Sequence, residues 1–147
     1  MNAHSGRMSG LKDVKNILAV YSCKGGVGKS TVAVNLAFSL MNLGKKVGIF
    51  DADLYGPSLP TMISPDNIHL YQDEKDPTKI MPIEFAGIKA MSYGFAAQNK
   101  TAVMRGPMAS NLVSQLVGST KWEELDYLVI DFPPGTGDIQ LTLSQEM

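Results

Sequence analysis

The chain has 147 residues, of which 44% are hydrophobic and 18% charged, and its formal net charge at pH 7 is −1. This length is typical of one domain that can bury a sizeable core, and the composition is ordinary for a globular protein. The small net charge gives no reason to expect whole-surface attraction to nucleic acid or to an anionic membrane. No apolar run approaches the roughly 20 residues that a membrane-spanning helix needs.

The first 16 residues are polar and carry charges of both signs. They lack the apolar stretch of a signal peptide, and they are too short and too weakly basic for a complete transit peptide. We therefore expect residues 1–16 to form a flexible lead and the protein not to be secreted. Cys23 is the only cysteine, so no intrachain disulfide can form, although this indicates a reducing compartment only weakly.

The first part of the domain predicts a strand, a helix and a second strand. Residues 16–21 form an apolar run that enters a glycine cluster, as a strand buried on both faces does. Apolar residues at helical spacing over 30–43 predict an amphipathic helix, and Gly44 is placed to cap its end. Residues 47–50 predict the second strand, which ends at Asp51. Such a βαβ unit implies a parallel sheet with a right-handed crossover.

The middle of the chain is less regular. Residues 54–79 hold four prolines among polar residues, which indicates a loop with room for one helical turn. Residues 79–85 and 88–93 predict a hairpin, and Pro82 confines its first strand to the edge of the sheet.

The last third returns to regular elements. Helical spacing over 109–117 predicts a helix with Pro107 near its start, and residues 127–130 predict a strand that ends at Asp131. The chain stops at Met147 within what reads as another helix. The alternation of strands and helices predicts an α/β fold: a mostly parallel, doubly wound sheet with helices on both faces.

A glycine-rich segment, CKGGVGKS, lies between the first predicted strand and the first predicted helix. Glycines let backbone N–H groups close around a phosphate chain, and a helix N-terminus adds further donors and a favourable dipole. Lys29 would reach the β- and γ-phosphates of a nucleotide, and the Ser30 hydroxyl would ligate Mg²⁺. Cys23 stands where the strict phosphate-loop pattern has its first glycine, whereas the variant x-K-G-G-x-G-K-[ST] is met in full. A turn with a solvated lysine is the disfavoured alternative. The expected phosphate-binding residues are Gly25, Gly26, Val27, Gly28, Lys29, Ser30 and Thr31.

Aspartates close two of the predicted strands. An aspartate in this position is commonly a turn former or a helix cap, but beside a phosphate loop it favours a nucleotide site. Asp131 is expected to hold the Mg²⁺ water shell, and Asp51 and Asp53 to lie near the γ-phosphate. In the glycine-bearing segment 131–138, Gly135 could donate its N–H to a γ-phosphate, as switch loops do. A rigid Pro-Pro-Gly turn is compatible with that role.

These motifs resemble a known family. Lys24 in KGGVGKS resembles the signature lysine of the deviant Walker A loop in the MinD and ParA P-loop ATPases. Three longer segments resemble the Mrp branch, whose members carry or scaffold iron–sulfur clusters, at residues 50–60, 104–108 and 130–138. Residues 22–26 and 30–37 are most similar to the plastid-type (high-chlorophyll-fluorescence) members that deliver 4Fe–4S clusters.

The resemblance implies a homodimer that binds Mg–ATP and hydrolyses it slowly, in the service of 4Fe–4S cluster assembly or transfer to iron–sulfur acceptor proteins. Lys24 would reach across the dimer to the partner's nucleotide and stabilise transition-state charge. Asp53, or alternatively Asp51, would orient the attacking water. We expect no nucleic acid or membrane partner, and a location in the cytoplasm or in an organelle such as a plastid or mitochondrion.

The sequence departs from the family pattern in two ways. Family members bridge a cluster through a C-terminal Cys-x-x-Cys pair, which this sequence lacks, and their adenine-binding residues lie beyond the position of Met147. We therefore expect residues 17–147 to be the N-terminal part of one truncated ATPase domain, without the cluster ligands. A MinD- or ParA-type positioning switch on membrane or DNA, and a metabolic ligase, remain alternatives. Cys23 is interpreted as a small residue replacing glycine, with a reactive thiol as the less favoured reading.

Overall fold

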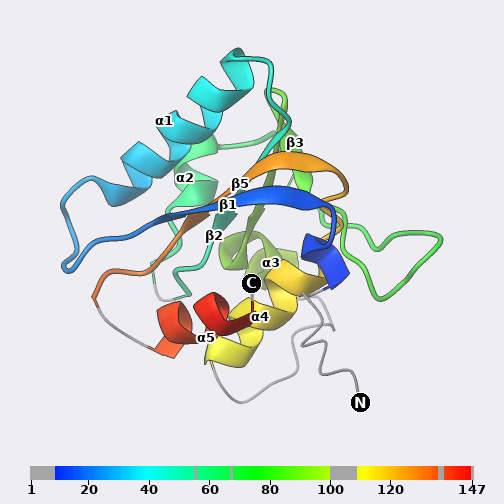
Figure 1. Cartoon of the computed structure of the whole chain (residues 1–147). Coiled ribbons are helices and arrows are strands. Elements are labelled where there is room, and N and C mark those ends of the chain that lie inside the picture. The colour runs from blue at the N-terminus through cyan, green and yellow to red at the C-terminus, as the bar shows by residue number, and fades with distance from the viewer. Residues whose placement is uncertain (1–8, 55, 67, 100–108, 136–137, 147) are drawn as a thin grey trace, which may run out of the picture.

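The computed structural model describes residues 9–54, 56–66, 68–99, 109–135 and 138–146. Five strands form one sheet in the order β1-β5-β2-β4-β3, and every pair of neighbours is parallel except the antiparallel pair β3 and β4. The strands are β1 (Val14–Val20), β2 (Val47–Asp51), β3 (Ile83–Phe85), β4 (Ile88–Ser92) and β5 (Leu125–Asp131). The helices are α1 (Lys29–Asn42), α2 (Leu59–Ile63), α3 (Tyr93–Asn99), α4 (Ala109–Ser119) and α5 (Asp138–Glu146), and Figure 1 shows their arrangement. The predicted α/β class is confirmed.

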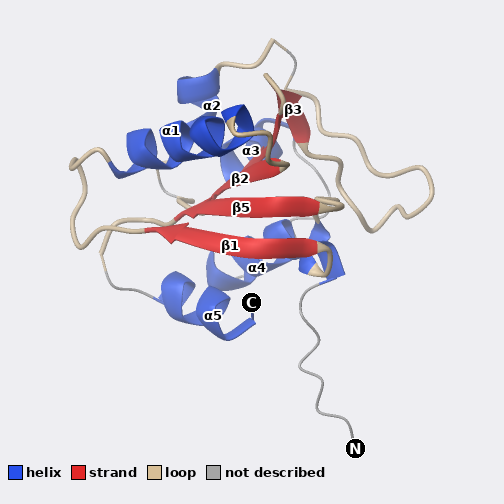
Figure 2. Ribbon diagram, turned by 45° about the horizontal axis from the view of Figure 1, so that its top comes forward, coloured by secondary structure: helices blue, strands red, loops and turns tan. Residues whose placement is uncertain are grey.

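The central strands β2, β4 and β5 are largely buried on both faces of the sheet. Helices α1 and α2 cover one face and helices α4 and α5 cover the other (Figure 2). Successive residues of one strand serve opposite cores, because Ile49 of β2 packs with the α1 side and Phe50 with the α4 side. Double burial explains the apolar runs of β2 and β5. It was wrongly predicted for β1, which lies at the edge of the sheet and in which only Val14 is buried. Among the described residues, no helix is long and apolar enough to cross a bilayer.

Helix α1 ends as its sequence predicts. Gly44 follows the helix with φ 83°, and its N–H donates to the carbonyl of Met41 at 2.8 Å. The N–H of Lys45 donates to the carbonyl of Leu40 at 3.2 Å, which completes a Schellman motif. The chain then turns directly into β2, so the predicted βαβ unit is present.

The predicted flexible lead is too long. Residues Ser9–Leu11 form a 3-10 turn, and both Gly10 and Leu11 are buried. Strand β1 begins at Val14, which is also buried, rather than at residue 16. Leu11 and Val14 are isolated apolar residues in a polar stretch and give no periodic signal. The sequence therefore did not predict their contact with the core. Residues 1–8 lie outside the described residues.

The middle of the chain holds one unpredicted helix. The predicted hairpin is present, with a shorter first strand at the sheet edge and a turn at Ala86 and Gly87, whose φ angles are 47° and 90°. Its second strand ends at Ser92, and α3 starts where the strand was expected to continue. Helix α2 supplies the single helical turn expected in the long loop. Residues 104–108 lie outside the described residues.

Candidate functional site

The carboxyl ends of three parallel strands meet at one edge of the sheet. Because β5 lies between β1 and β2, Asp131 pairs in register with Val20 on one side and Asp51 on the other. The ladder continues one residue further, where the N–H of Ala52 donates to the carbonyl of Asp131 at 3.0 Å. The strand order therefore places Asp131 between the phosphate loop that follows β1 and the acidic end of β2, which is where open α/β sheets bind ligands.

The phosphate loop runs from the end of β1 into α1. Gly26 and Gly28 have φ angles of 74° and 85°, and nothing lies within 4 Å of the position that a Cβ would take on either residue. Glycine is thus needed here for its backbone conformation and not for lack of space. Gly28 precedes Lys29, the first residue of α1, so the loop delivers the lysine to the start of a helix.

Lys29 and Asp131 form an ion pair at the base of this loop. Their side chains are only 9% and 5% exposed, and the Lys29 Nζ contacts the Asp131 Oδ1. The same Nζ lies 3.4 Å from the Ser30 hydroxyl oxygen. The amino group of Lys29 thus contacts both the Ser30 hydroxyl and the Asp131 carboxylate. These are the three groups that the sequence assigned to phosphate and magnesium.

A cavity of about 330 Å³ opens over the phosphate loop, within the range of known ligand sites. Asp53 lines it, whereas Val27, which the sequence also proposed, is exposed and does not. The cavity also includes four residues that sequence reasoning did not assign to the phosphate site. The lining residues are Ser22, Gly25, Gly26, Gly28, Lys29, Ser30, Thr31, Asp53, Gly56, Ser58 and Pro134. Gly56 and Ser58 follow Asp53 closely, and that proximity was the available signal.

Asp51 and Asp53 lie in different environments. Asp51 is 1% exposed, and its carboxylate accepts hydrogen bonds from the N–H groups of Asp53 and Leu59, both at 3.1 Å, and from the Ser92 hydroxyl at 3.2 Å. Burial raises the pKa of the Asp51 carboxyl from 3.8 to about 6, and the charge of Asp131 adds to this. Asp51 therefore joins β2, β4 and the start of α2. Of the two aspartates, Asp53 is the one that reaches the cavity.

The turn after β5 (residues 133–135, called here the β5–α5 turn) lies over the phosphate loop. Pro134 is next to Gly25, since a Cβ added there would lie 3.7 Å from the Pro134 Cγ. The Gly135 N–H donates to the Ser22 carbonyl at 3.0 Å, so in this structure the predicted phosphate donor is bonded to the loop itself. Lys24 is exposed, and its backbone carbonyl accepts a hydrogen bond from the Ser22 hydroxyl at 2.8 Å. Residues 136 and 137 lie outside the described residues.

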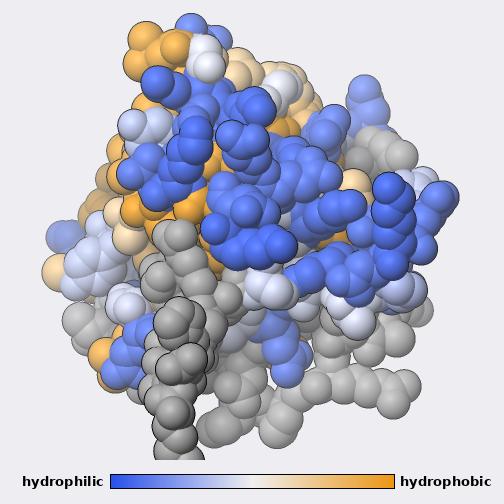
Figure 3. All heavy atoms as spheres, turned by 45° about the vertical axis from the view of Figure 1, so that its right-hand side comes forward, coloured by the Kyte–Doolittle hydropathy of each residue, from blue (hydrophilic) through white to orange (hydrophobic). Residues whose placement is uncertain are grey.

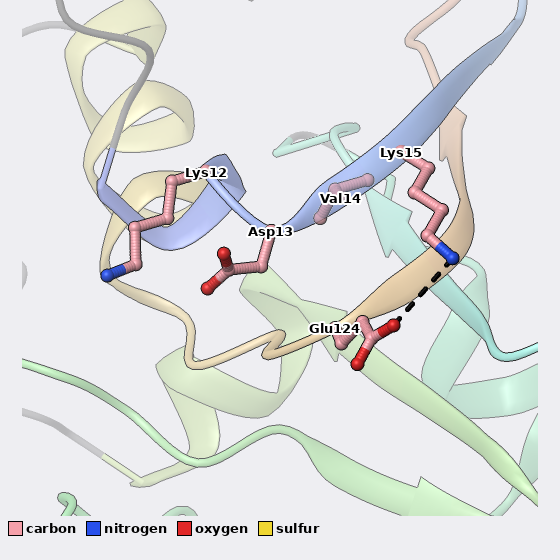
Figure 4. Close-up of a pocket in the computed structure, with 5 residues that line it drawn as sticks. All are labelled: Lys12, Asp13, Val14, Lys15 and Glu124. Carbon is pink, nitrogen blue, oxygen red and sulfur yellow. Dashed lines mark ion pairs between the residues drawn. The ribbon is translucent and has the colours of Figure 1, made fainter.

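A larger hollow lies at the opposite end of β1. Its volume is about 570 Å³, and Figure 4 shows the residues that line it: Lys12, Asp13, Val14, Lys15 and Glu124. Lys15 pairs there with Glu124 at 3.7 Å and with Asp126 at 3.3 Å. Hydrophilic residues also gather over the side of the molecule that lies on the right in Figure 1 (Figure 3). Exposed ion pairs of this kind contribute little to stability. The phosphate-loop cavity, which combines glycine backbone, a lysine and an aspartate, is the stronger candidate site.

The described residues include no separate cluster of metal-ligating side chains. No group of three or more His, Cys, Asp or Glu residues in the described part of the chain is arranged to hold a metal ion. Cys23 is exposed and lies beside the phosphate loop, and the Tyr21 hydroxyl approaches its Sγ at 3.8 Å.

Comparisons with known proteins identify the family of this chain. Residues 13–147 match the family described as ParA: NUBPL iron-transfer P-loop NTPase. The chain is 58% identical over 144 residues to the Fe-S cluster assembly factor HCF101, chloroplastic, of Oryza sativa subsp. japonica, which covers 97% of this chain and 27% of that protein. It is 52% identical over 139 residues to the iron-sulfur cluster carrier protein of Escherichia coli (strain K12), covering 94% and 37% respectively. The chain thus spans well under half the length of these relatives.

Solved structures share the fold. A nucleotide-binding protein in complex with ADP from Archaeoglobus fulgidus superimposes with a TM-score of 0.79 and is 36% identical, covering 99% of this chain and 56% of that one. A ParA family ATPase from Chlorobium tepidum TLS has a TM-score of 0.60 at 18% identity, covering 92% of this chain and 58% of its own, which shows the fold alone.

Proposed function

The chain belongs to the ParA-type, NUBPL iron-transfer family of P-loop NTPases, and on that premise we propose that it binds Mg–ATP in the phosphate-loop cavity. As a homodimer it would hydrolyse ATP slowly and serve the assembly or transfer of 4Fe–4S clusters. The observation that carries this proposal is the cavity itself, which is lined by the phosphate loop with Lys29 and by Asp53, while Asp131 pairs with Lys29.

Phosphate binding follows from the charges at the base of the cavity. Lys29 is paired with Asp131, and a nucleotide's phosphate chain offers the lysine a competing and stronger negative charge. Backbone N–H groups of residues 25–31, together with the α1 N-terminus, would hold the remaining phosphate oxygens. Movement of Lys29 toward the phosphates would release the Asp131 carboxylate.

The same residues fit a magnesium ion. The Ser30 hydroxyl and the Asp131 carboxylate both lie against the Lys29 amino group, and both are the hard oxygen donors that Mg²⁺ prefers. Ser30 would bind the ion directly and Asp131 would hold its water shell. When bound, the ion would neutralise charge on the phosphate oxygens.

Hydrolysis needs an oriented water and positive charge near the transferred group. The Asp53 carboxylate is the acidic group that reaches the cavity, so it is the proposed water-orienting residue, and Asp51 is assigned to positioning the loop that carries it. Lys24 stands exposed at the rim, where a second copy of the chain could place its nucleotide against it. Such a lysine would act in trans, as an arginine finger does.

The cluster is cargo, and its ligands are proposed to lie outside these 147 residues, because the only cysteine is Cys23. Relatives that are 48–61% identical to this chain are named as iron–sulfur cluster carriers or assembly factors, which supports acceptor proteins as partners. Two of these relatives are named as chloroplastic and the others are bacterial, and we propose a location in an organelle or in the cytoplasm. No observation favours the positioning-switch alternative over this function.

Anaerobic reconstitution with iron and sulfide tests the proposal. The protein with any natural sequence beyond residue 147 is compared with residues 1–147 alone, by absorbance, iron content and ATP binding. A brown longer protein beside a colourless short one supports cluster carriage with ligands elsewhere. A colourless longer protein that still binds ATP would leave a nucleotide switch with a different cargo.

A further inference from the structure

The β5–α5 turn is held from two opposite sides. On one side, the Gly135 N–H donates to the Ser22 carbonyl and Pro134 lies next to Gly25 of the phosphate loop. On the other side, the amide of Gln140 in α5 donates from its Nε2 to the carbonyls of Pro133 at 3.0 Å and Gly135 at 2.9 Å. The turn is therefore a bridge between the phosphate loop and α5.

The two carbonyls that Gln140 binds flank one particular peptide group. The Pro133 carbonyl belongs to the peptide before the Pro134–Gly135 peptide, and the Gly135 carbonyl belongs to the peptide after it. The peptide between them carries the Gly135 N–H. A side chain that fixes both neighbouring peptides also fixes the direction of the N–H between them, which now points at Ser22.

Helix α5 is a firm support for this amide. Ile139 and Leu143, on either side of Gln140 along the helix, are buried in the core that α4 and the sheet share. The Gln140 Oε1 is buried and has no hydrogen-bond partner among the described residues, so the amide is held by its donated bonds alone. Exchanging its oxygen and nitrogen would set an oxygen against two carbonyls, which excludes the flipped amide.

We infer that Gln140 is a positioning residue that holds the Gly135 N–H on the phosphate loop and thereby sets how far the site favours a nucleoside triphosphate over a diphosphate. This rests on the proposed nucleotide binding. A γ-phosphate can recruit the Gly135 N–H only after that N–H leaves the Ser22 carbonyl, and Gln140 resists the required rotation. A diphosphate has no γ-phosphate and binds with the Ser22 bond intact.

The test replaces Gln140 with methionine, which keeps the length of the side chain and removes both donors. Gln145→Met is the matched control, because Gln145 lies on the same helix and is exposed. Dissociation constants are measured for ADP and for a non-hydrolysable ATP analogue. With Gln140→Met, the preference for the ATP analogue over ADP should rise about three- to tenfold, the worth of one or two hydrogen bonds, while the control keeps the wild-type ratio.

Two results would overturn the inference while the proposed function stands: an unchanged ratio, or a parallel loss of both affinities, which marks a merely structural role. A wild-type protein that binds neither nucleotide would instead overturn the proposed function and this inference with it. If Gln140→Met does not fold, the inference is tested on the wild type, by following the NMR resonance of the Gly135 amide as nucleotide is added. It should stay in place with ADP and move with the ATP analogue, and equal movement with both would refute the proposed role of Gln140.

Discussion

At the scale of single residues, the ionisation of Asp51 at the end of β2 should make the stability of the protein depend on pH. Its pKa is raised by burial from 3.8 to about 6, so the folded state binds this proton more tightly than the unfolded state does. The free energy of unfolding should therefore fall as the pH rises from about 4 to about 6, by about 1.4 kcal/mol per unit of pKa shift. Above that range, ionisation of Asp51 should change the stability little.

Substitution of Asp51 tests this dependence. Asp51→Asn cannot ionise, so urea unfolding at a series of pH values should show a flatter profile between pH 4 and 6 than the wild type. The slope is compared rather than the absolute stability at pH 7, because the variant also changes a hydrogen bond. In the wild type the Leu59 N–H donates to the Asp51 carboxylate, and in the variant it could face the NH₂ group of the asparagine. If the variant and the wild type show the same slope in that window, the assignment of the titration to Asp51 is wrong.

The Lys29–Asp131 pair makes a second prediction at this scale. Both side chains are nearly buried, so removing one partner leaves the other charge without compensation. Lys29→Met and Asp131→Asn should each lower the free energy of unfolding by about 3 kcal/mol, and the double variant should lose much less than the sum. Chemical denaturation of the four proteins measures the coupling. Additive losses would show that the two charges do not interact in solution.

At the scale of elements, the N-terminal turn docks on the end of α4. A Cβ on Gly10 would lie 2.5 Å from the carbonyl oxygens of both Gly118 and Thr120, and backbone atoms cannot move aside cheaply. Gly10→Ala should therefore destabilise the protein by about 1–3 kcal/mol. Thermal unfolding measures the effect, with Lys12→Ala as a control, because Lys12 is exposed and should change stability by less than about 0.5 kcal/mol. Equal effects of the two variants would argue that residues 9–11 are not docked in solution.

Elements whose signals are local were predictable, and their spatial order was not. The glycine pattern of residues 25–28 and the apolar runs of β1, β2 and β5 identify the βαβ unit and the phosphate loop, because periodicity and backbone conformation depend on neighbours in sequence. The insertion of β5 between β1 and β2 brings Asp131 against Lys29, and no local pattern reports it. The contact of Gln140 with the β5–α5 turn is equally invisible in sequence, because glutamine in a helix is usually a solvated residue.

At the scale of the whole molecule, the phosphate-loop cavity opens to the surface. Lys24 is exposed and does not line the cavity, whereas Gly25 and Gly26, the next two residues of the phosphate loop, do. Lys24→Ala should therefore leave ATP affinity nearly unchanged and lower kcat by at least about a hundredfold, because a cation supplied in trans acts mainly on the transition state. Nucleotide titration and phosphate release separate the two effects. A loss of binding would place Lys24 in its own subunit's site.

Mixing two inactive variants carries that argument to the assembly. In a mixed dimer of Lys24→Ala and Asp53→Asn subunits, one site combines the intact Asp53 of the first subunit with the Lys24 of the second, and the other site has both defects. Each variant alone forms only defective sites. Activity should therefore reappear when the two inactive proteins are mixed, if the lysine acts across the dimer. If Lys24 served its own subunit, every site would lack one group, and the mixture would stay as inactive as its components.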